Sequence, residues 1–124
     1  MTDTVTISQT FTLTVDDIST YAGNDVYYWG EAEFSTDTYG LLVREHENDE
    51  ADPIFVSWQT LREAFVQCVK NEDKNGERLM GYPHEYFLNA VRDAEDGVPD
   101  WGHIDGTASD IWLQVAAFGQ IVYG

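Results

Sequence analysis

Acidic side chains are the groups in this sequence whose number and spacing favour a specific chemistry. Glu31 and Glu33 stand two residues apart in a segment with strand character, and such side chains lie about 6.6 Å apart on one face of a strand. Glu45, Glu47 and Asp49 repeat the spacing if the following strand extends that far. Because this separation is close to that of successive phosphates, the pattern favours mimicry of a nucleic-acid backbone.

Two acidic clusters extend this pattern. The first places five acids in the eight residues 45–52, and the second follows position 92, after which the chain has no lysine or arginine. Charge runs usually form solvated faces or loops, and that interpretation stays open for both clusters. Together with Glu31 and Glu33, the candidate partner-binding acids are Glu45, Glu47, Asp49, Glu50, Asp52, Asp93, Glu95, Asp96 and Asp100.

Two aromatic residues accompany the first acids. Tyr27 and Trp29 occupy alternate positions ahead of Glu31 and Glu33, so a strand there places all four side chains on one face. Exposed rings beside carboxylates would stack on an arginine or make cation–π contacts with it. Tyr27 and Trp29 are therefore candidate partner-binding residues, with packing beneath a helix as the alternative.

Histidines next to acids are the candidates for acid–base or metal chemistry. His84 precedes Glu85 at an expected helix start, where we expect it to face solvent, and His103 lies near Asp105 in a turn-rich segment, where we expect a loop hydrogen bond. Helical metal sites pair ligands three or four residues apart, with His or Cys dominant, and that spacing is missing. The sequence has no phosphate loop, nucleophile elbow or calcium loop, and Cys68 lies on an apolar stripe. We therefore expect a non-enzymatic protein without a metal or other cofactor.

The net charge explains why binding is favoured over catalysis. The chain has 23 Asp and Glu against six Lys and Arg, a net charge of −17, whereas solubility needs a magnitude of about 2 to 8. Charges ~10 Å apart in water repel by about 0.4 kcal/mol, so the folded state is destabilised at low salt, a cost that a cationic partner or a very salty environment would offset. Phosphate contacts require Lys and Arg, which excludes nucleic acid as the ligand. Adaptation to saturated salt, which screens charges beyond ~3 Å, remains the rival explanation.

Two stretches of sequence resemble a known kind of protein. DVYYWGEAEF and SDIWLQVAAFGQIVYG are similar to small acidic proteins encoded by phages and prophages, particularly of actinobacteria. The resemblance carries no catalytic motif. It implies a context, because small acidic phage proteins are often inhibitors of host defence, including anti-CRISPR and anti-restriction proteins that resemble DNA to their targets.

Charge and resemblance together predict a DNA-mimicking inhibitor in the host cytoplasm. Its expected partner is a basic nucleic-acid-binding protein such as a CRISPR effector or a restriction enzyme, and its oligomeric state is left open between monomer and dimer. No apolar run reaches the ~18 residues needed to cross a membrane. The alternative is an interaction module that docks through an aromatic patch around Trp29 or Trp101, with the charge serving only solubility.

Hydrophobic periodicity predicts the elements that position these groups. Alternating apolar residues predict strands over 5–15, 26–34 and 39–46, the last two forming an antiparallel hairpin. Apolar residues three and four apart predict helices over 58–70, 83–96 and from 107 or 109 to 118, after a short helical turn at Asp16. The closing residues 121–124 are expected to extend the last helix or add a strand.

The order of these elements predicts the fold class. Strands come first and helices second, without regular alternation, which is typical of an α+β fold. We expect one domain over residues 1–124, with an antiparallel sheet of three to four strands in the N-terminal half packed by about three α-helices in the C-terminal half.

Overall fold

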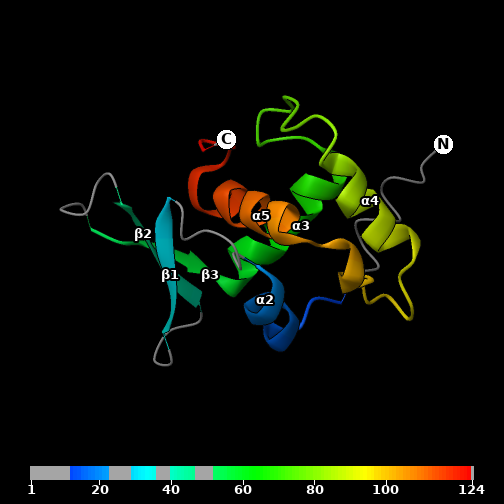
Figure 1. Cartoon of the computed structure of the whole chain (residues 1–124), viewed down its shortest axis with the longest axis horizontal. Helices are drawn as coiled ribbons and strands as arrows, with labels where there is room; N and C mark the ends of the chain where they lie inside the picture. Colours follow the sequence, from blue (N-terminus) through cyan, green and yellow to red (C-terminus); the bar gives the residue numbers. More distant parts are fainter. Residues whose placement is uncertain (1–11, 23–28, 36–39, 47–51, 124) are drawn as a thin grey trace.

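An α+β fold is seen in the computed structural model, which describes residues 12–22, 29–35, 40–46 and 52–123 (Figure 1). The strands are β1 (Gly30–Ser35), β2 (Gly40–Glu45) and β3 (Ile54–Ser57). The helices are α2 (Val15–Tyr21), α3 (Trp58–Lys70), α4 (His84–Arg92) and α5 (Gly106–Phe118), with a 3-10 turn η2 (Trp101–His103). Among the described residues, no helix combines the length and apolar character needed to cross a membrane.

The three strands form one antiparallel sheet in the order β1–β2–β3. The predicted hairpin is confirmed as β1 and β2. The structure also contains a strand that is not among the predicted ranges: residues 54–57 pair with β2 as β3, a strand of four residues. Of the strand expected over 5–15, residues 5–11 lie outside the described ranges, and Val15 begins α2 instead, with Thr14 as its cap. The Thr14 hydroxyl accepts a hydrogen bond from Asp17 N at 3.1 Å.

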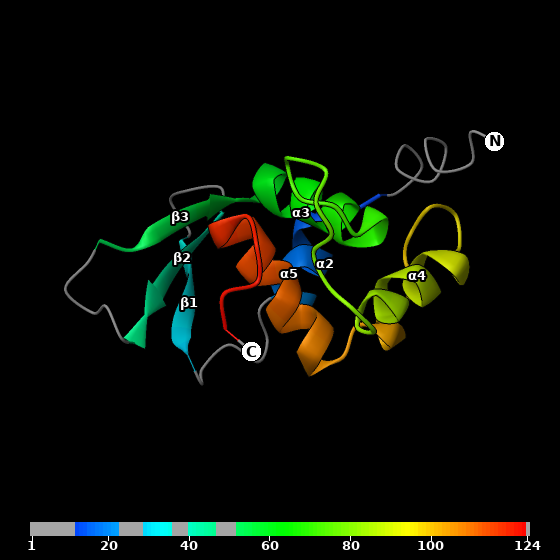
Figure 2. The ribbon, with the colours of Figure 1, turned by 90° about the horizontal axis from the view of Figure 1, so that it is seen from above.

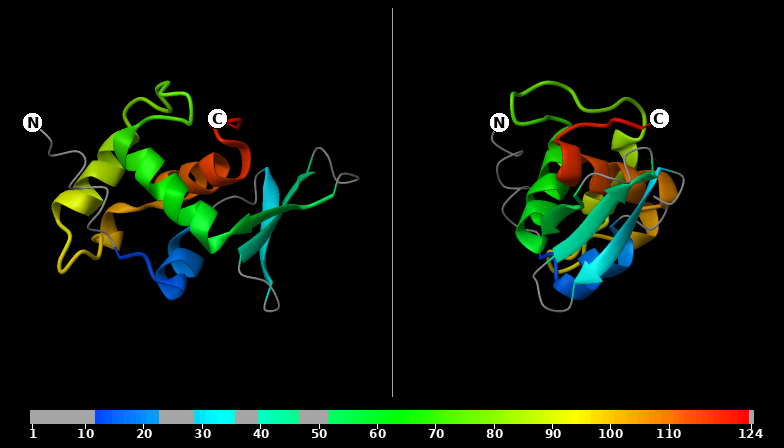
Figure 3. Two further views of the ribbon diagram at one scale, coloured as in Figure 1. Left: turned by 180° about the vertical axis from the view of Figure 1, so that it is seen from behind. Right: turned by 90° about the vertical axis from the view of Figure 1, so that its left-hand side faces the viewer.

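Helices cover one face of this sheet. Seen from the sheet end, β1 and β2 lie in front of the helices (Figure 3, right), and from above the sheet lies on one side of α5 with α4 on the other (Figure 2). Leu41, Val43 and Val56 point into the molecule and are buried. The alternate residues form the outer face, where Glu33 and Phe55 are exposed and Leu42 is half-buried. The sheet is therefore a two-sided element with one face in the core.

The core is centred on α5 and is built from aromatic rings. Every residue of α5 from 108 to 115 is buried. The Trp112 ring stacks on Trp101 at 5.7 Å and meets the edge of Phe65 at 5.1 Å, and Trp112 Nε1 donates to Leu61 O at 2.8 Å. Trp101 is itself buried and stacks on Tyr21 at 5.0 Å. The Trp101 ring therefore packs against the core instead of standing exposed on the surface, while docking around this residue stays a prediction.

Trp29 also belongs to the interior. Its side chain is buried, and its Nε1 donates a hydrogen bond to Asp110 Oδ1 at 2.6 Å. The Trp29 ring stacks on Tyr123 with ring centroids 5.1 Å apart, and its centroid lies 5.5 Å from that of Phe118 of α5. The prediction of an exposed partner-binding Trp29 is thus wrong, and the alternative of packing against a helix is confirmed. The reason is that the strand, and with it the alternation of faces, begins only at Gly30. Tyr27 lies outside the described residues.

The C-terminal segment is held by one buried glutamine. Gln114 Oε1 accepts hydrogen bonds from Val122 N and Tyr123 N, both at 2.8 Å, while its Nε2 donates to Asp110 Oδ2 and Tyr123 O, both at 3.1 Å. Gly119 ends α5 at φ 77°, as predicted. Residues 120–123 form neither helix nor strand, so the expected extension is wrong. Hydrogen bonds between the Gln114 side chain and the backbone of residues 122 and 123 take the place of the backbone–backbone hydrogen bonds that a helix or a strand would have supplied.

The two later helices differ from the predictions only at their ends. α4 ends at Arg92 rather than near 96, because Asp96 and Gly97 take left-handed conformations, φ 53° and 80°, that reverse the chain. α5 begins at Gly106, slightly earlier than expected, since the Asp105 side chain accepts from Ala108 N. The predicted bounds of α3 are confirmed, and the Ser57 side chain caps its start by accepting a hydrogen bond from Thr60 N.

Replacing Gln114 should destabilise the fold. Gln114→Ala removes the acceptor for the partly buried Val122 and Tyr123 N–H groups, at a cost of about 1 to 3 kcal/mol in the free energy of unfolding. Urea unfolding measures this change, and Gln59→Ala, an exposed glutamine on α3, is the matched control. An equal effect of both substitutions would contradict the role of Gln114 in holding the tail.

Candidate functional site

The second acidic cluster surrounds a surface hollow. A depression of about 590 Å³ is lined by Tyr21, Asp93, Glu95, Asp96, Val98, Pro99, Asp100, Trp101 and Gly102. All four predicted acids of this cluster line it, and all four are exposed. We call this depression the acidic hollow. It combines carboxylates with two aromatic residues, which is the composition expected of a site for an organic cation.

The chain reversal after α4 brings these acids together. Asp93 is the C-cap residue that directly follows α4. The turn at Asp96 and Gly97 then reverses the direction of the chain. Asp100 N then donates to Ala90 O of α4 at 2.8 Å, while the Asp100 side chain caps η2 by accepting from Gly102 N at 3.0 Å. Carboxylates from both arms of the reversal therefore face the same depression.

Tyr21 and Trp101 form the aromatic wall of the hollow. They belong to α2 and η2, and their rings are stacked 5.0 Å apart with an interplanar angle of 9°. Trp101 Nε1 is buried, and no described residue accepts a hydrogen bond from it, so stacking is what holds this ring. Sequence reasoning missed Tyr21 as a site residue. Tyr21 lies at the end of a short helix and far along the chain from the acids, so no motif or spacing in the sequence indicated that it belongs to the site.

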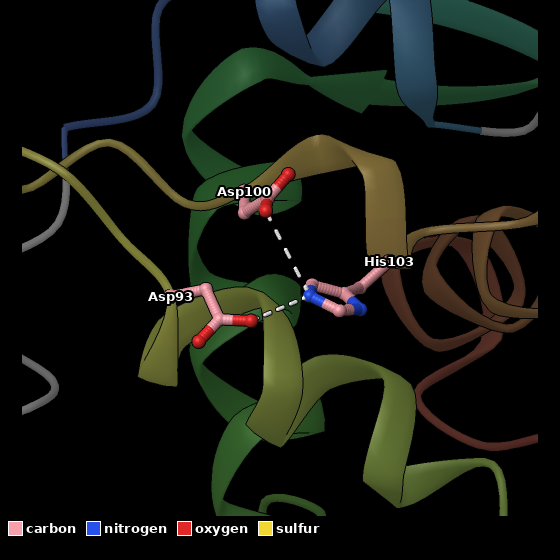
Figure 4. Close-up of side chains that lie close together, drawn as sticks. All are labelled: Asp93, Asp100 and His103. Atoms are coloured by element: carbon pink, nitrogen blue, oxygen red, sulfur yellow. Dashed lines mark hydrogen bonds and ion pairs between the residues drawn. The ribbon is translucent and has the colours of Figure 1, made fainter.

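His103 lies between two of the acids. Its Nε2 is 2.8 Å from Asp93 Oδ2 and 3.7 Å from Asp100 Oδ2 (Figure 4). The expected hydrogen-bonded histidine is confirmed, but its partner is not the neighbouring Asp105, which caps α5. The pairing with Asp93 spans ten positions and depends on the chain reversal, so residue spacing could not indicate it.

Arg92 sets the electrostatics at Asp93. Its Nε and Nη2 donate to the two Asp93 oxygens at 3.0 and 2.9 Å. These hydrogen bonds, followed by the one from His103, lower the pKa of Asp93 to about 2. The same contacts raise the pKa of Arg92. Asp93 is thus anionic at all physiological pH values. The Arg92–Asp93 pair is an example, within this chain, of a carboxylate that binds a guanidinium group.

The same residues offer donors for a divalent cation. One ligand atom from each of Asp93, Asp100 and His103 lies within 4.8 Å of the others. Carboxylate oxygens and an imidazole nitrogen suit several divalent metals. Arg92 competes for this position, however, because it already engages both Asp93 oxygens. The arrangement therefore favours an organic cation that joins Glu95 and Asp100 over a metal that must displace Arg92.

Glu31, Glu33 and the described acids of the first cluster, Glu45 and Asp52, lie apart from the acidic hollow. Glu31 and Glu33 are exposed on the outer face of β1, as predicted, and Asp52 is exposed just before β3. Glu45 lies on the opposite face of the sheet. In the register Arg44 pairs with Glu31 on the outer face, so the adjacent pair, Glu45 with Gly30, lies on the inner face. Glu45 is half-buried and accepts a hydrogen bond from the Tyr123 hydroxyl.

Among the described residues, the two groups of acids do not form one continuous row. The sheet and the segment after α4 lie at opposite ends of the long axis (Figure 1). Glu47, Asp49 and Glu50 fall outside the described residues, so their predicted roles are untested. The described candidate acids are therefore divided between two surfaces.

The other candidates for chemistry have structural surroundings. His84 Nε2 lies 2.6 Å from Val69 O and the residue is half-buried, so the prediction that it only faces solvent is wrong, while Glu85 is exposed. Cys68 is fully buried, as its stripe indicated, and burial raises the pKa of its thiol. Comparison with protein-family models, curated proteins and solved structures finds no match for this chain.

The Asp93 pKa provides a test of the geometry of the hollow. Because this pKa is lowered in the folded state, the contribution of Asp93 to stability is present above its unfolded value of about 3.9 and is lost as the pH falls towards about 2. A carbon-13 NMR titration of the carboxyl groups should give the low value. Arg92→Gln should raise it more than His103→Gln. A normal Asp93 pKa in the parent protein would contradict the arrangement.

Proposed function

We propose that this protein is a DNA-mimicking inhibitor that blocks the basic groove of a nucleic-acid-binding defence protein, such as a CRISPR effector or a restriction enzyme. The observation that carries the proposal is the acidic hollow, where exposed carboxylates of Glu95, Asp96 and Asp100 surround one depression next to Tyr21. In this function the hollow receives arginine or lysine side chains that otherwise hold phosphates.

The chemistry of the hollow suits a guanidinium group. A guanidinium presents a planar fork of donors that matches a carboxylate, and its face stacks on aromatic rings. The Arg92–Asp93 pair is an internal example of the first contact. Tyr21, half-buried and backed by Trp101, supports the second. A partner arginine would thus meet both kinds of contact in one place.

The charge of the whole chain supports the same proposal. Grooves that hold nucleic acid are lined with Lys and Arg, and a body with net charge −17 is attracted to them over a distance. Steering by this field speeds association at low salt. Occupying the groove then excludes DNA sterically and by repulsion, so no catalytic residue is required.

Adaptation to high salt is the second candidate, and the distribution of acids favours it in one respect. Exposed acids also occur on α3, on α4 and in the segment between them, at Glu63, Glu72, Glu77 and Glu85. An acidic surface on all sides is what salt adaptation requires. The two candidates differ in whether the molecule needs concentrated salt to fold and in whether the hollow is a special place on the surface.

Neutralising the hollow should weaken inhibition. The triple variant Glu95→Gln, Asp96→Asn, Asp100→Asn keeps the shape of each side chain, and asparagine at 100 can still cap η2. Three exposed charge contacts of about 0.5 to 1 kcal/mol each predict a loss of about 10- to 100-fold in affinity. The assay is displacement of a fluorescent duplex from purified CRISPR effectors and restriction enzymes, using the target from which the parent displaces DNA.

A charge-matched variant distinguishes the site from the total charge. Glu72→Gln, Glu77→Gln, Glu85→Gln removes the same number of charges at exposed positions outside the hollow and should change the affinity by less than about threefold. Equal losses for the two variants would assign inhibition to net charge alone. A target that binds the protein and the duplex together would contradict mimicry.

The folded state should persist at low salt. In about 0.1 M NaCl, screening extends over about 10 Å, and the buried aromatic core is expected to hold the molecule together against charge repulsion. Far- and near-ultraviolet circular dichroism during thermal unfolding should show one cooperative transition there. Loss of near-ultraviolet signal at 0.1 M with recovery in multimolar salt would favour salt adaptation instead.

A further inference from the structure

The outer face of the sheet carries an apolar pair where a solvated sheet normally carries polar residues. Leu42 of β2 and Phe55 of β3 are partners in the register, and Glu33 of β1 is the partner of Leu42 on the other side. Phe55 is 48% exposed and Leu42 is half-buried. The three side chains form one row across the strands, from carboxylate through aliphatic to aromatic. We call this surface the outer sheet face, and it also includes Glu31 and Arg44.

This row is more than a single exposed apolar residue. Antiparallel sheets with one face in the core commonly place polar side chains on the other, and cross-strand neighbours on one face touch each other. The helices lie against the opposite face (Figure 3), where Leu41, Val43 and Val56 are already buried. Leu42 and Phe55 therefore take no part in that core, and an exposed aromatic side chain beside a half-buried aliphatic one, with a polar edge, offers a partner an apolar surface to cover.

Charge decides what kind of partner this surface fits. Arg44 lies opposite Glu31 in the register, and its positive charge offsets the charge of Glu31. Glu33 is then the acid with an uncompensated charge next to the apolar pair, and Asp52 is exposed just before β3. A second copy of this chain would bring together two bodies of net charge −17. Like charges opposed across an interface are destabilising, so a cationic partner is favoured over self-association.

We propose that the outer sheet face docks a segment of a partner protein in which lysine or arginine alternates with apolar side chains. The apolar side chains cover Leu42 and Phe55, and the cations meet Glu33. Burial of the apolar pair is insensitive to salt, whereas the contacts to the carboxylates are screened. This inference does not depend on the acidic hollow, which lies at the other end of the molecule (Figure 1).

Two peptides of equal charge test the proposal. One alternates lysine with leucine, and the other alternates lysine with glycine. Each is titrated into the nitrogen-15-labelled protein in about 0.5 M NaCl, where exposed charge contacts are largely screened. The lysine–leucine peptide should shift the amide signals of Glu33, Leu42 and Phe55 most, and the lysine–glycine peptide should bind at least about fivefold more weakly, the equivalent of roughly 1 kcal/mol of apolar burial.

Variants connect the binding to the row. Phe55→Thr keeps a residue that suits a strand and should weaken lysine–leucine binding at least about fivefold, with the lysine–glycine peptide unaffected. Val122→Thr, at an apolar side chain exposed to a similar degree elsewhere, is the control and should change neither. Glu33→Gln should weaken both peptides at low salt and therefore tests the charge contact without altering the apolar pair.

Three results would overturn the proposal. The first is a lysine–leucine peptide that shifts signals mainly outside the sheet, and the second is unchanged binding by Phe55→Thr. The third is a dimer in sedimentation velocity that Phe55→Thr dissociates, which would make this face a self-interface. The variant with a neutralised hollow should bind the lysine–leucine peptide as the parent does, so this test fails or succeeds separately from the inhibition assay.

Discussion

Burial of aromatic rings around α5 is the interaction on which the rest of this molecule depends. The acids on the surface repel one another, and the opposing stabilisation comes from a core in which Trp112 contacts Trp101 and Phe65. The Trp112 indole also donates to the backbone of α3, at Leu61. These contacts join α3, α5 and η2, and Tyr21 adds α2 through its stack on Trp101. The same stack provides the wall of the acidic hollow, so the site is formed by the edge of the core.

The acids of this chain divide into those with structural contacts and those that lie exposed on a surface. Asp105 caps a helix, Asp110 is buried against Trp29 and Gln114, and Asp93 is held by Arg92 and His103. Glu95 and Asp96, by contrast, are exposed side chains at the hollow. Net charge alone does not separate these roles. The separation matters because exposed carboxylates can be offered to a partner without loss of the fold.

Periodicity in the sequence was sufficient for the elements that bury one clear face. Helix α3 shows apolar residues at Leu61, Phe65 and Cys68, and its bounds and cap were predicted correctly. The hairpin followed from alternation around Ala32 and Val43. Four-residue β3 is too short to show a period, and it becomes a strand because β2 supplies its hydrogen-bond partners. The α+β class followed from these elements.

The parts that sequence reasoning missed depend on contacts between distant residues. Alternation left Trp29 open between an exposed position and packing beneath a helix, and only its stack on Tyr123 and its bond to Asp110, positions far along the chain, decide for packing. The pairing of His103 with Asp93 requires the turn at Asp96, which the longer predicted helix had removed. The acids of the hollow were correctly singled out as a cluster, because they are neighbours in sequence, whereas their aromatic wall was not.

Binding of a cationic partner surface by this acidic body, as proposed, makes the complex sensitive to salt. The dissociation constant of the complex with its target is therefore to be measured as a function of salt concentration, between about 0.05 and 0.2 M. The logarithm of the affinity is expected to fall steeply and linearly with the logarithm of salt concentration, and neutralising the hollow should make this slope shallower. An affinity that stays constant over that range would rule out an electrostatic interface.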